Sequence, residues 1–78
     1  MTVQHLRNIP LKTIREYLIW KGLRKYRTSG GHEIWGGSNL GRPITIQTHI
    51  DPVPEFIVKQ ILRALNADRD DFLTFLNS

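Results

Sequence analysis

Three histidines are the residues of this 78-residue chain best suited to acid and base chemistry near neutral pH. His32 follows Gly30 and Gly31, and two glycines allow a backbone or a phosphate group to approach closely. A histidine beside glycine is more often an ordinary turn residue, so both interpretations stay open at this point. His49 and His5 have less suggestive surroundings, at the end of an expected strand and near the N-terminus.

Other common kinds of chemical site lack their residues in this sequence. Cysteine is absent, which removes disulfides, thiolate ligands and cysteine nucleophiles and makes the cytoplasm the expected compartment. The histidines are far apart and form no zinc motif, so neither a metal nor another cofactor is expected. The glycine-rich stretch 36–41 lacks the Lys-Ser/Thr pair of a phosphate-binding loop and is expected to be a hairpin loop. No long apolar run is present, so neither a signal peptide nor a membrane span is expected.

Basic residues are concentrated in the first part of the chain. Residues 1–49 contain eight Lys or Arg and two acids, a net charge of +6, whereas residues 50–78 contain three and five, a net charge of −2. Arg24, Lys25 and Arg27 surround Tyr26 just before His32, an arrangement that can bring phosphate contacts beside a base-stacking ring. The alternative is a solvated strand with one core tyrosine. Charge alone does not separate a surface for a polyanion from a plain solvated one.

The spacing of apolar residues predicts six elements in the order α-β-β-β-α-α. We expect Asn8 to cap the first helix and Asp68 to cap the last. The predicted elements are a helix from Pro10 to a stop at Gly22, strands over 23–28, 32–35 and 44–49, a second helix over 54–65 and a short third helix over 68–77. This order predicts one α+β domain over residues 1–78, with 1–8 as an N-terminal tail. It consists of a three-stranded antiparallel sheet with helices on one face.

The sequence allows two positions for His32 in this sheet. His32 and Ile34 lie on the same face of their strand, since side chains alternate. Ile34 is the smaller and more β-typical core residue, which favours His32 at the rim of the helix-covered face. If Trp35 is buried instead, His32 lies on the open face. Trp20 lies opposite the apolar stripe of the first helix and is either exposed or covered by the N-terminal segment.

Three segments of the chain follow one another in the order of a known family pattern. They are Gly30-Gly31-His32 with Trp35, then Thr45 to His49, then Pro54 followed by Ile57 to Leu62. Together they resemble the HicA family of toxin–antitoxin mRNA interferases over roughly residues 10–65. Members have an α-β-β-β-α fold like that of double-stranded-RNA-binding domains, and typically carry Gly-Ser-His with an aromatic residue three positions later. Two departures stand out here: Gly31 replaces the serine, and Ile46-Gln47 replaces the Val-Pro that many members have.

The resemblance implies an endoribonuclease that cleaves mRNA without the ribosome and so inhibits translation and growth, with His32 as its catalytic residue. It also implies a HicB-type antitoxin protein that binds the toxin and masks the site. RNA supplies its own nucleophile, the 2′-OH, so one histidine can act without a metal. The residues expected to bind the RNA are Arg24, Lys25, Arg27, Gly30, Gly31, Trp35 and His49.

Two other functions stay open on the sequence. One is a non-catalytic RNA-binding module of the same fold, which would lose little if His32 were replaced. The other is a protein-interaction adaptor that uses Trp20, Trp35 and the acidic C-terminal helix, and it would show no salt-sensitive affinity for RNA.

Overall fold

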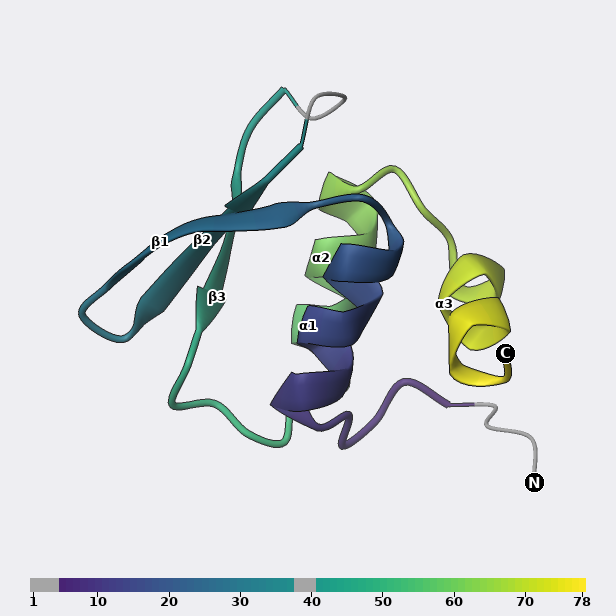
Figure 1. Cartoon of the computed structure of the whole chain (residues 1–78). Coiled ribbons are helices and arrows are strands. Elements are labelled where there is room, and N and C mark those ends of the chain that lie inside the picture. Colours follow the sequence, from purple (N-terminus) through teal and green to yellow (C-terminus); the bar gives the residue numbers. More distant parts are fainter. Residues whose placement is uncertain (1–4, 38–40) are drawn as a thin grey trace.

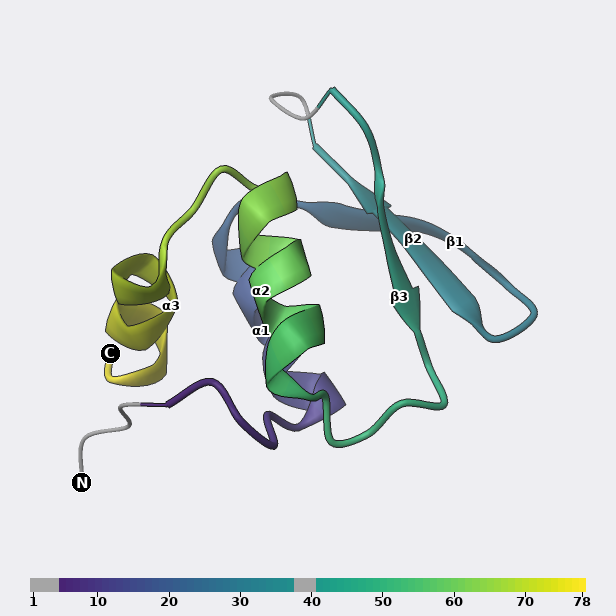
Figure 2. The same ribbon diagram turned by 180° about the vertical axis from the view of Figure 1, so that it is seen from behind.

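The computed structural model describes residues 5–37 and 41–78. It contains α1 (Leu11–Trp20), β1 (Arg24–Ser29), β2 (His32–Gly36), β3 (Ile44–Gln47), α2 (Glu55–Ala64) and α3 (Arg69–Leu76). The strands form one antiparallel sheet with β2 in the middle. Helices α1 and α2 cover one face of this sheet, and α3 packs on the far side of the helix pair (Figures 1 and 2). The predicted α+β fold, with all helices on one side of a three-stranded antiparallel sheet, is confirmed.

A distant carboxylate caps the start of α1, so the prediction that Asn8 caps this helix is wrong. Asn8 has a φ of 55° and lies ahead of the helix, whose N-cap residue is Pro10. The Leu11 backbone N–H donates instead to Oδ1 of Asp51 over 3.0 Å. This bond ties α1 to the loop between β3 and α2, and a carboxylate near a helix N-terminus also interacts favourably with the helix dipole.

Two other predicted helix signals, the stop at Gly22 and the cap at Asp68, are confirmed. Gly22 adopts a φ of 88°, and the Leu23 N–H donates to the Leu18 carbonyl over 2.9 Å, which is the Schellman arrangement that ends α1. Asp68 caps α3 by accepting a 2.9 Å hydrogen bond from the Asp71 N–H.

The core lies between the sheet and the α1–α2 pair and continues to α3. Strand β3 alternates as predicted, with Ile44 and Ile46 buried and the residues between and after them exposed. Phe72 of α3 is fully buried against Tyr17 of α1, with ring centroids 4.8 Å apart. The residues that α1 and α2 bury in this core are Leu11, Ile14, Tyr17, Leu18, Val58, Ile61 and Leu62.

Some element ends differ from the prediction. Strand β1 starts and ends one residue later, at Arg24 and Ser29, and β3 ends at Gln47, so His49 lies in the turn that follows. Trp20 is 47% exposed, and its ring lies 5.4 Å from that of Phe75, so α3 lies beside it. The predicted hairpin loop over 36–41 includes positions 38–40, which lie outside the described residues.

Within residues 5–37 and 41–78, no helix is long and apolar enough to cross a membrane.

Candidate nucleic-acid interface

His32 lies on the open face of the sheet, at the first position of the central strand β2. Its side chain is exposed, and it pairs with Ser29 of β1 and Gln47 of β3. Glu33 and Trp35 are each only 4% exposed and point toward the helices. The expectation that Ile34 is the core residue and that His32 lies at the helix-side rim is therefore wrong.

A network of charged hydrogen bonds explains this orientation of β2. The guanidinium of Arg15, on α1, donates to both carboxylate oxygens of Glu33, from Nη2 over 2.7 Å and from Nε over 3.1 Å. The Trp35 indole N–H donates to the same carboxylate over 3.1 Å. The hydrogen bond from Arg15, helped by that from Trp35, holds the pKa of Glu33 below its ordinary value, although burial acts in the opposite direction. A buried acid with several partners thus takes a core position that sequence patterning assigns to an apolar residue.

The glycine turn that leads into His32 is held by the segment after β3. Gly30 has a φ of 61°, which favours glycine, and the Gly31 carbonyl accepts hydrogen bonds from the Thr48 N–H and hydroxyl over 2.8 and 3.1 Å. His49 follows directly, and a Cβ atom placed on Gly31 would lie 3.5 Å from its Nδ1. The structure therefore brings His32, the glycine turn and His49 to the same end of the sheet.

A Cβ atom would fit at Gly31. The nearest atoms to a Cβ at this position are at ordinary van der Waals distances, 3.5 and 3.8 Å, and Gly31 is not among the residues with positive φ. The backbone at Gly31 therefore does not require glycine.

The predicted basic residues of β1 do not share one face. Directly paired residues of antiparallel strands direct their side chains to the same side. Arg27 pairs with Ile34 and Arg24 pairs with Gly36, so both arginines lie on the open face. Lys25 pairs with Trp35 and lies on the helix side, where its charge also favours the ionised form of Glu33.

Trp35 does not reach the open face. Its indole is buried and bonded to Glu33, so it supports β2 from the helix side, and its placement argues against the predicted direct contact with RNA. The indole's buried N–H needs an acceptor, which the glutamate two residues earlier supplies. This pairing of neighbours on one strand face was not recognised from the sequence.

Tyr26 is an exposed aromatic residue on the open face, and not the core tyrosine that the alternative interpretation required. It lies at a register shift between Lys25 and Arg27 and is 61% exposed. Its ring lies across Gly36, where an added Cβ would be only 2.6 Å from Cε2 of the tyrosine. The ring is thereby held against the sheet next to the arginines.

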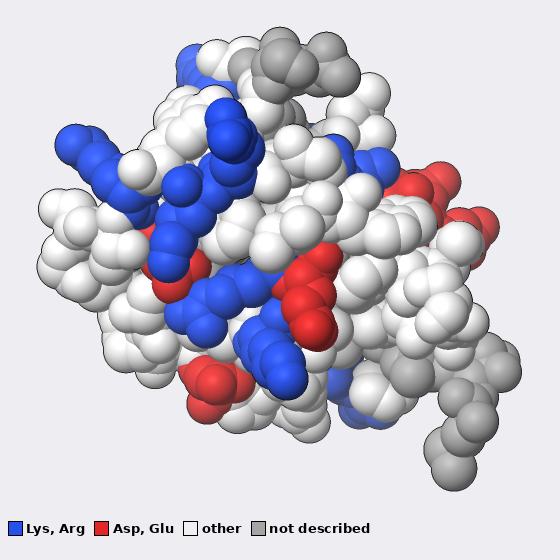
Figure 3. Space-filling view, in the orientation of Figure 1, with Lys and Arg blue, Asp and Glu red and all other residues white. Residues whose placement is uncertain are grey.

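The open face has a positive electrostatic character. Its strand positions are Arg24, Tyr26, Arg27, Ser29, His32, Ile34, Gly36, Thr45 and Gln47, which include arginines and no acid. Basic side chains also gather along the β1 edge of the molecule, with acidic groups among them (Figure 3). An exposed surface that combines arginines, polar groups and an aromatic ring suits a nucleic acid.

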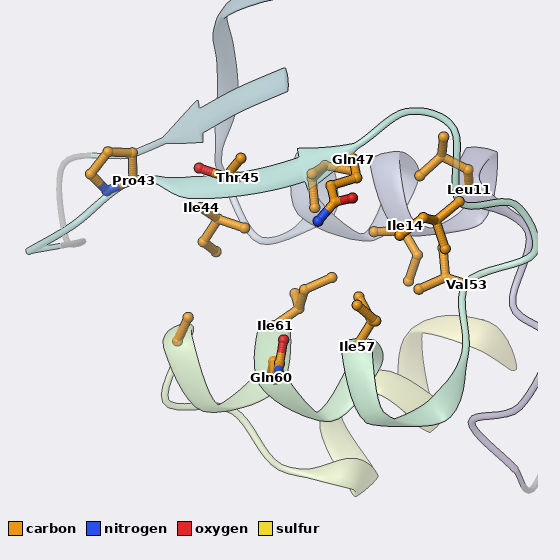
Figure 4. Close-up of a pocket in the computed structure, with 13 residues that line it drawn as sticks. Leu11, Ile14, Pro43, Ile44, Thr45, Gln47, Val53, Ile57, Gln60 and Ile61 are labelled. Atoms are coloured by element: carbon orange, nitrogen blue, oxygen red, sulfur yellow. The ribbon is translucent and has the colours of Figure 1, made fainter. Parts of the chain in front are cut away.

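A separate cavity lies between β3 and α2. It has a volume of about 230 Å³, and isoleucines such as Ile44, Ile57 and Ile61 line it from both sides (Figure 4). Its lining contains no titratable side chain and does not include His32. In the described part of the chain, no three His, Asp or Glu side chains are grouped as ligands of a metal ion would be.

Comparison of the chain with models of known protein families, with curated proteins and with solved structures finds no match.

Proposed function

We propose that this protein is an endoribonuclease that cleaves mRNA independently of the ribosome and of metal ions, and that its activity inhibits translation and growth. The observation that carries the proposal is the position of His32, exposed on an open sheet face that bears arginines and no acid. The resemblance of the Gly30-Gly31-His32 segment to the HicA mRNA interferases supports the same activity. In this proposal the protein acts in the cytoplasm, where mRNA is found.

The proposed reaction uses the 2′-OH of the RNA as its nucleophile. Attack on the adjacent phosphorus forms a 2′,3′-cyclic phosphate and breaks the bond to the 5′-oxygen. A base takes the proton of the 2′-OH, and an acid gives a proton to the leaving 5′-oxygen. His32 is suited to either role, and His49 at the same end of the sheet is suited to the other.

Positive charge on the open face would stabilise the reaction. The phosphate gains negative charge as the 2′-oxygen attacks, and cationic donors held near it lower the energy of that state. Arg24 and Arg27 lie on the same face as His32, one strand away, and guanidinium groups bind phosphate oxygens with two donors at once.

The proposal includes a HicB-type antitoxin as the protein partner. An antitoxin that covers the open face would block RNA and His32 together. The partner's binding is therefore expected to compete with RNA, which a gel-shift assay with both ligands measures.

The experiment that tests the proposed activity is cleavage of a long mRNA by the purified protein in excess EDTA. The unsubstituted chain should cut and leave 2′,3′-cyclic phosphate ends, whereas His32→Ala should lose the contribution of one acid or base, about 10²- to 10⁴-fold in rate. His5→Ala is the matched control, because His5 is also exposed but lies ahead of α1. Circular dichroism establishes that all three proteins fold.

Equal cutting by His32→Ala, or 5′-phosphate ends that appear only with a metal, would overturn the proposed mechanism. If the unsubstituted chain binds RNA without cutting it, and His32→Ala binds it equally well, the protein is instead an RNA-binding module of this fold.

A further inference from the structure

We infer that Tyr26, Gly36 and Arg42 form a binding subsite for one unpaired nucleobase, so that the RNA on the open face is single-stranded there. The inference rests on the proposed function in taking RNA as the ligand, and it adds where and how a base is recognised.

The backbone of β1 directs the tyrosine to this place. The register of β1 against β2 shifts between Lys25 and Arg27, so Tyr26 is the extra residue of a β-bulge. Bulges re-aim side chains, and they occur often beside functional sites. Without the shift, strict alternation would not place Tyr26 and Arg27 on the same face.

Gly36 provides the room for the ring. A Cβ on Gly36 would lie 2.6 Å from Cε2 and 3.1 Å from Cζ of Tyr26, which is closer than real Cβ atoms approach. Glycine therefore lets the ring lie directly on the strand, while 61% of the tyrosine remains exposed. A ring that is held on one side and exposed on the other can accept a base.

A hollow and a cation lie beside this ring. A cavity of about 110 Å³ is lined by Tyr26, Gly36, Gly37, Arg42 and Pro43. Arg42 is exposed, and its guanidinium can stack on a base or bind the phosphate next to it. Ring, hollow and cation together are the features that single-stranded nucleic-acid sites use.

This chemistry selects an unpaired base. In an A-form duplex the faces of the bases are stacked inside the helix, so proteins recognise it by shape and by contacts to the backbone. An aromatic platform can act only on a base that has left the stack. Gly36 is four residues from His32 along β2, about 13 Å at the rise of a strand, so the bound base is a short distance along the RNA from the cleaved bond.

A purely structural role for Tyr26 makes a different prediction. Aromatic residues that cover a glycine in a sheet stabilise the sheet. In that case, loss of the ring would lower stability and leave the RNA affinity of the folded protein unchanged.

The test measures RNA affinity in the His32→Ala background, in which cutting is expected to be slow. The probes are a short fluorescent oligouridine and an RNA duplex of similar length. Tyr26→Leu should weaken oligouridine binding about five- to 150-fold, Tyr26→Phe should retain it, and duplex binding should not distinguish the two variants.

A pair of glycine variants tests the position of the ring without removing it. Gly36→Ala should displace the ring and weaken oligouridine binding. Gly41→Ala is the matched control, because no atom lies within 4 Å of a Cβ placed there and Gly41 does not line the hollow, and it should bind like the parent. Photocrosslinking of 5-iodouridine RNA to the His32→Ala protein needs no change at Tyr26 and should label the peptide that contains it.

Three results would overturn the subsite: equal oligouridine affinity of Tyr26→Leu and Tyr26→Phe, equal affinity of the two glycine variants, or a crosslink outside the Tyr26 peptide. If Tyr26→Leu with His32 intact cuts mRNA at the parent rate, the subsite is wrong and the proposed function stands. If no variant binds RNA, the proposed function fails, and the subsite fails with it.

Discussion

Removing the guanidinium of Arg15 tests how β2 is held in its orientation. In Arg15→Ala the Glu33 carboxylate, whose side chain is only 5% exposed, would retain the Trp35 indole as its one partner in the network. Breaking a fully buried ion pair from one side costs about 3 to 5 kcal/mol. The Arg15 side chain is 37% exposed, so water can replace part of its contribution. We therefore expect a loss of about 2 to 4 kcal/mol in the free energy of unfolding.

Two further variants separate the charge from the hydrogen bonds. Glu33→Gln keeps an oxygen that can accept from the Trp35 indole and removes the charge, so it should cost less, about 1 to 2 kcal/mol. Lys12→Ala is the control on the same helix: Lys12 is exposed, and its loss should change stability by less than about 0.5 kcal/mol. Urea denaturation followed by circular dichroism measures all three.

The pH dependence provides the decisive comparison. Without Arg15 the pKa of Glu33 loses its largest lowering influence, so protonation relieves the buried charge more readily. The difference between Arg15→Ala and the parent should therefore shrink as the pH falls below 4.5, the ordinary value for a glutamate. A loss no larger than that of Lys12→Ala at neutral pH, or a difference independent of pH, would refute the idea that this network holds β2.

Three other predictions concern the whole molecule. The pKa values of Glu33 and Asp71 are lowered, mainly by hydrogen bonds from Arg15 and Tyr17, so their stabilisation is present above the ordinary values of 4.5 and 3.8 and is lost as the pH falls through the lowered ones. Urea midpoints at neutral and acid pH measure this loss. Ile61→Ala should cost about 2 to 5 kcal/mol in the same assay, because Ile61 is a core residue of α2, and a loss below about 1 kcal/mol would contradict that role. Replacing both Arg24 and Arg27 by Ala should make RNA affinity less dependent on salt. The slope of log affinity against log salt concentration should fall in magnitude by about 0.7 for each phosphate that is no longer neutralised. An unchanged slope would mean that RNA binds elsewhere on the protein.

Local patterns were sufficient to predict the helices and strands. The apolar spacing of α2, the alternation of β3, the stop at Gly22 and the Asp68 cap each depend on residues close in sequence. The start of α1 shows the limit of such patterns. Its cap is Asp51, 40 residues away, and only the folded chain brings the carboxylate to the Leu11 N–H.

The face of His32 was not predictable for a related reason. The segment from His32 to Trp35 alternates without a clear apolar side, so the result depends on whether the isoleucine or the tryptophan is buried. Burial of Trp35 also buries Glu33, which is unfavourable unless a partner is present. That partner is Arg15, on another element, and sequence reasoning about β2 alone does not include it.

Because side chains alternate along β2, its two faces have different roles. Glu33 and Trp35, on the covered side, hold the strand to the helices, whereas His32, on the open side, has no part in that network and remains exposed. Stability and the proposed RNA cleavage should therefore depend on different residues of β2. Loss of cleavage in His32→Ala should come without loss of stability, while changes at Glu33 should lower stability first. A His32→Ala variant whose unfolding free energy fell as far as that of Arg15→Ala would show instead that the histidine supports the fold.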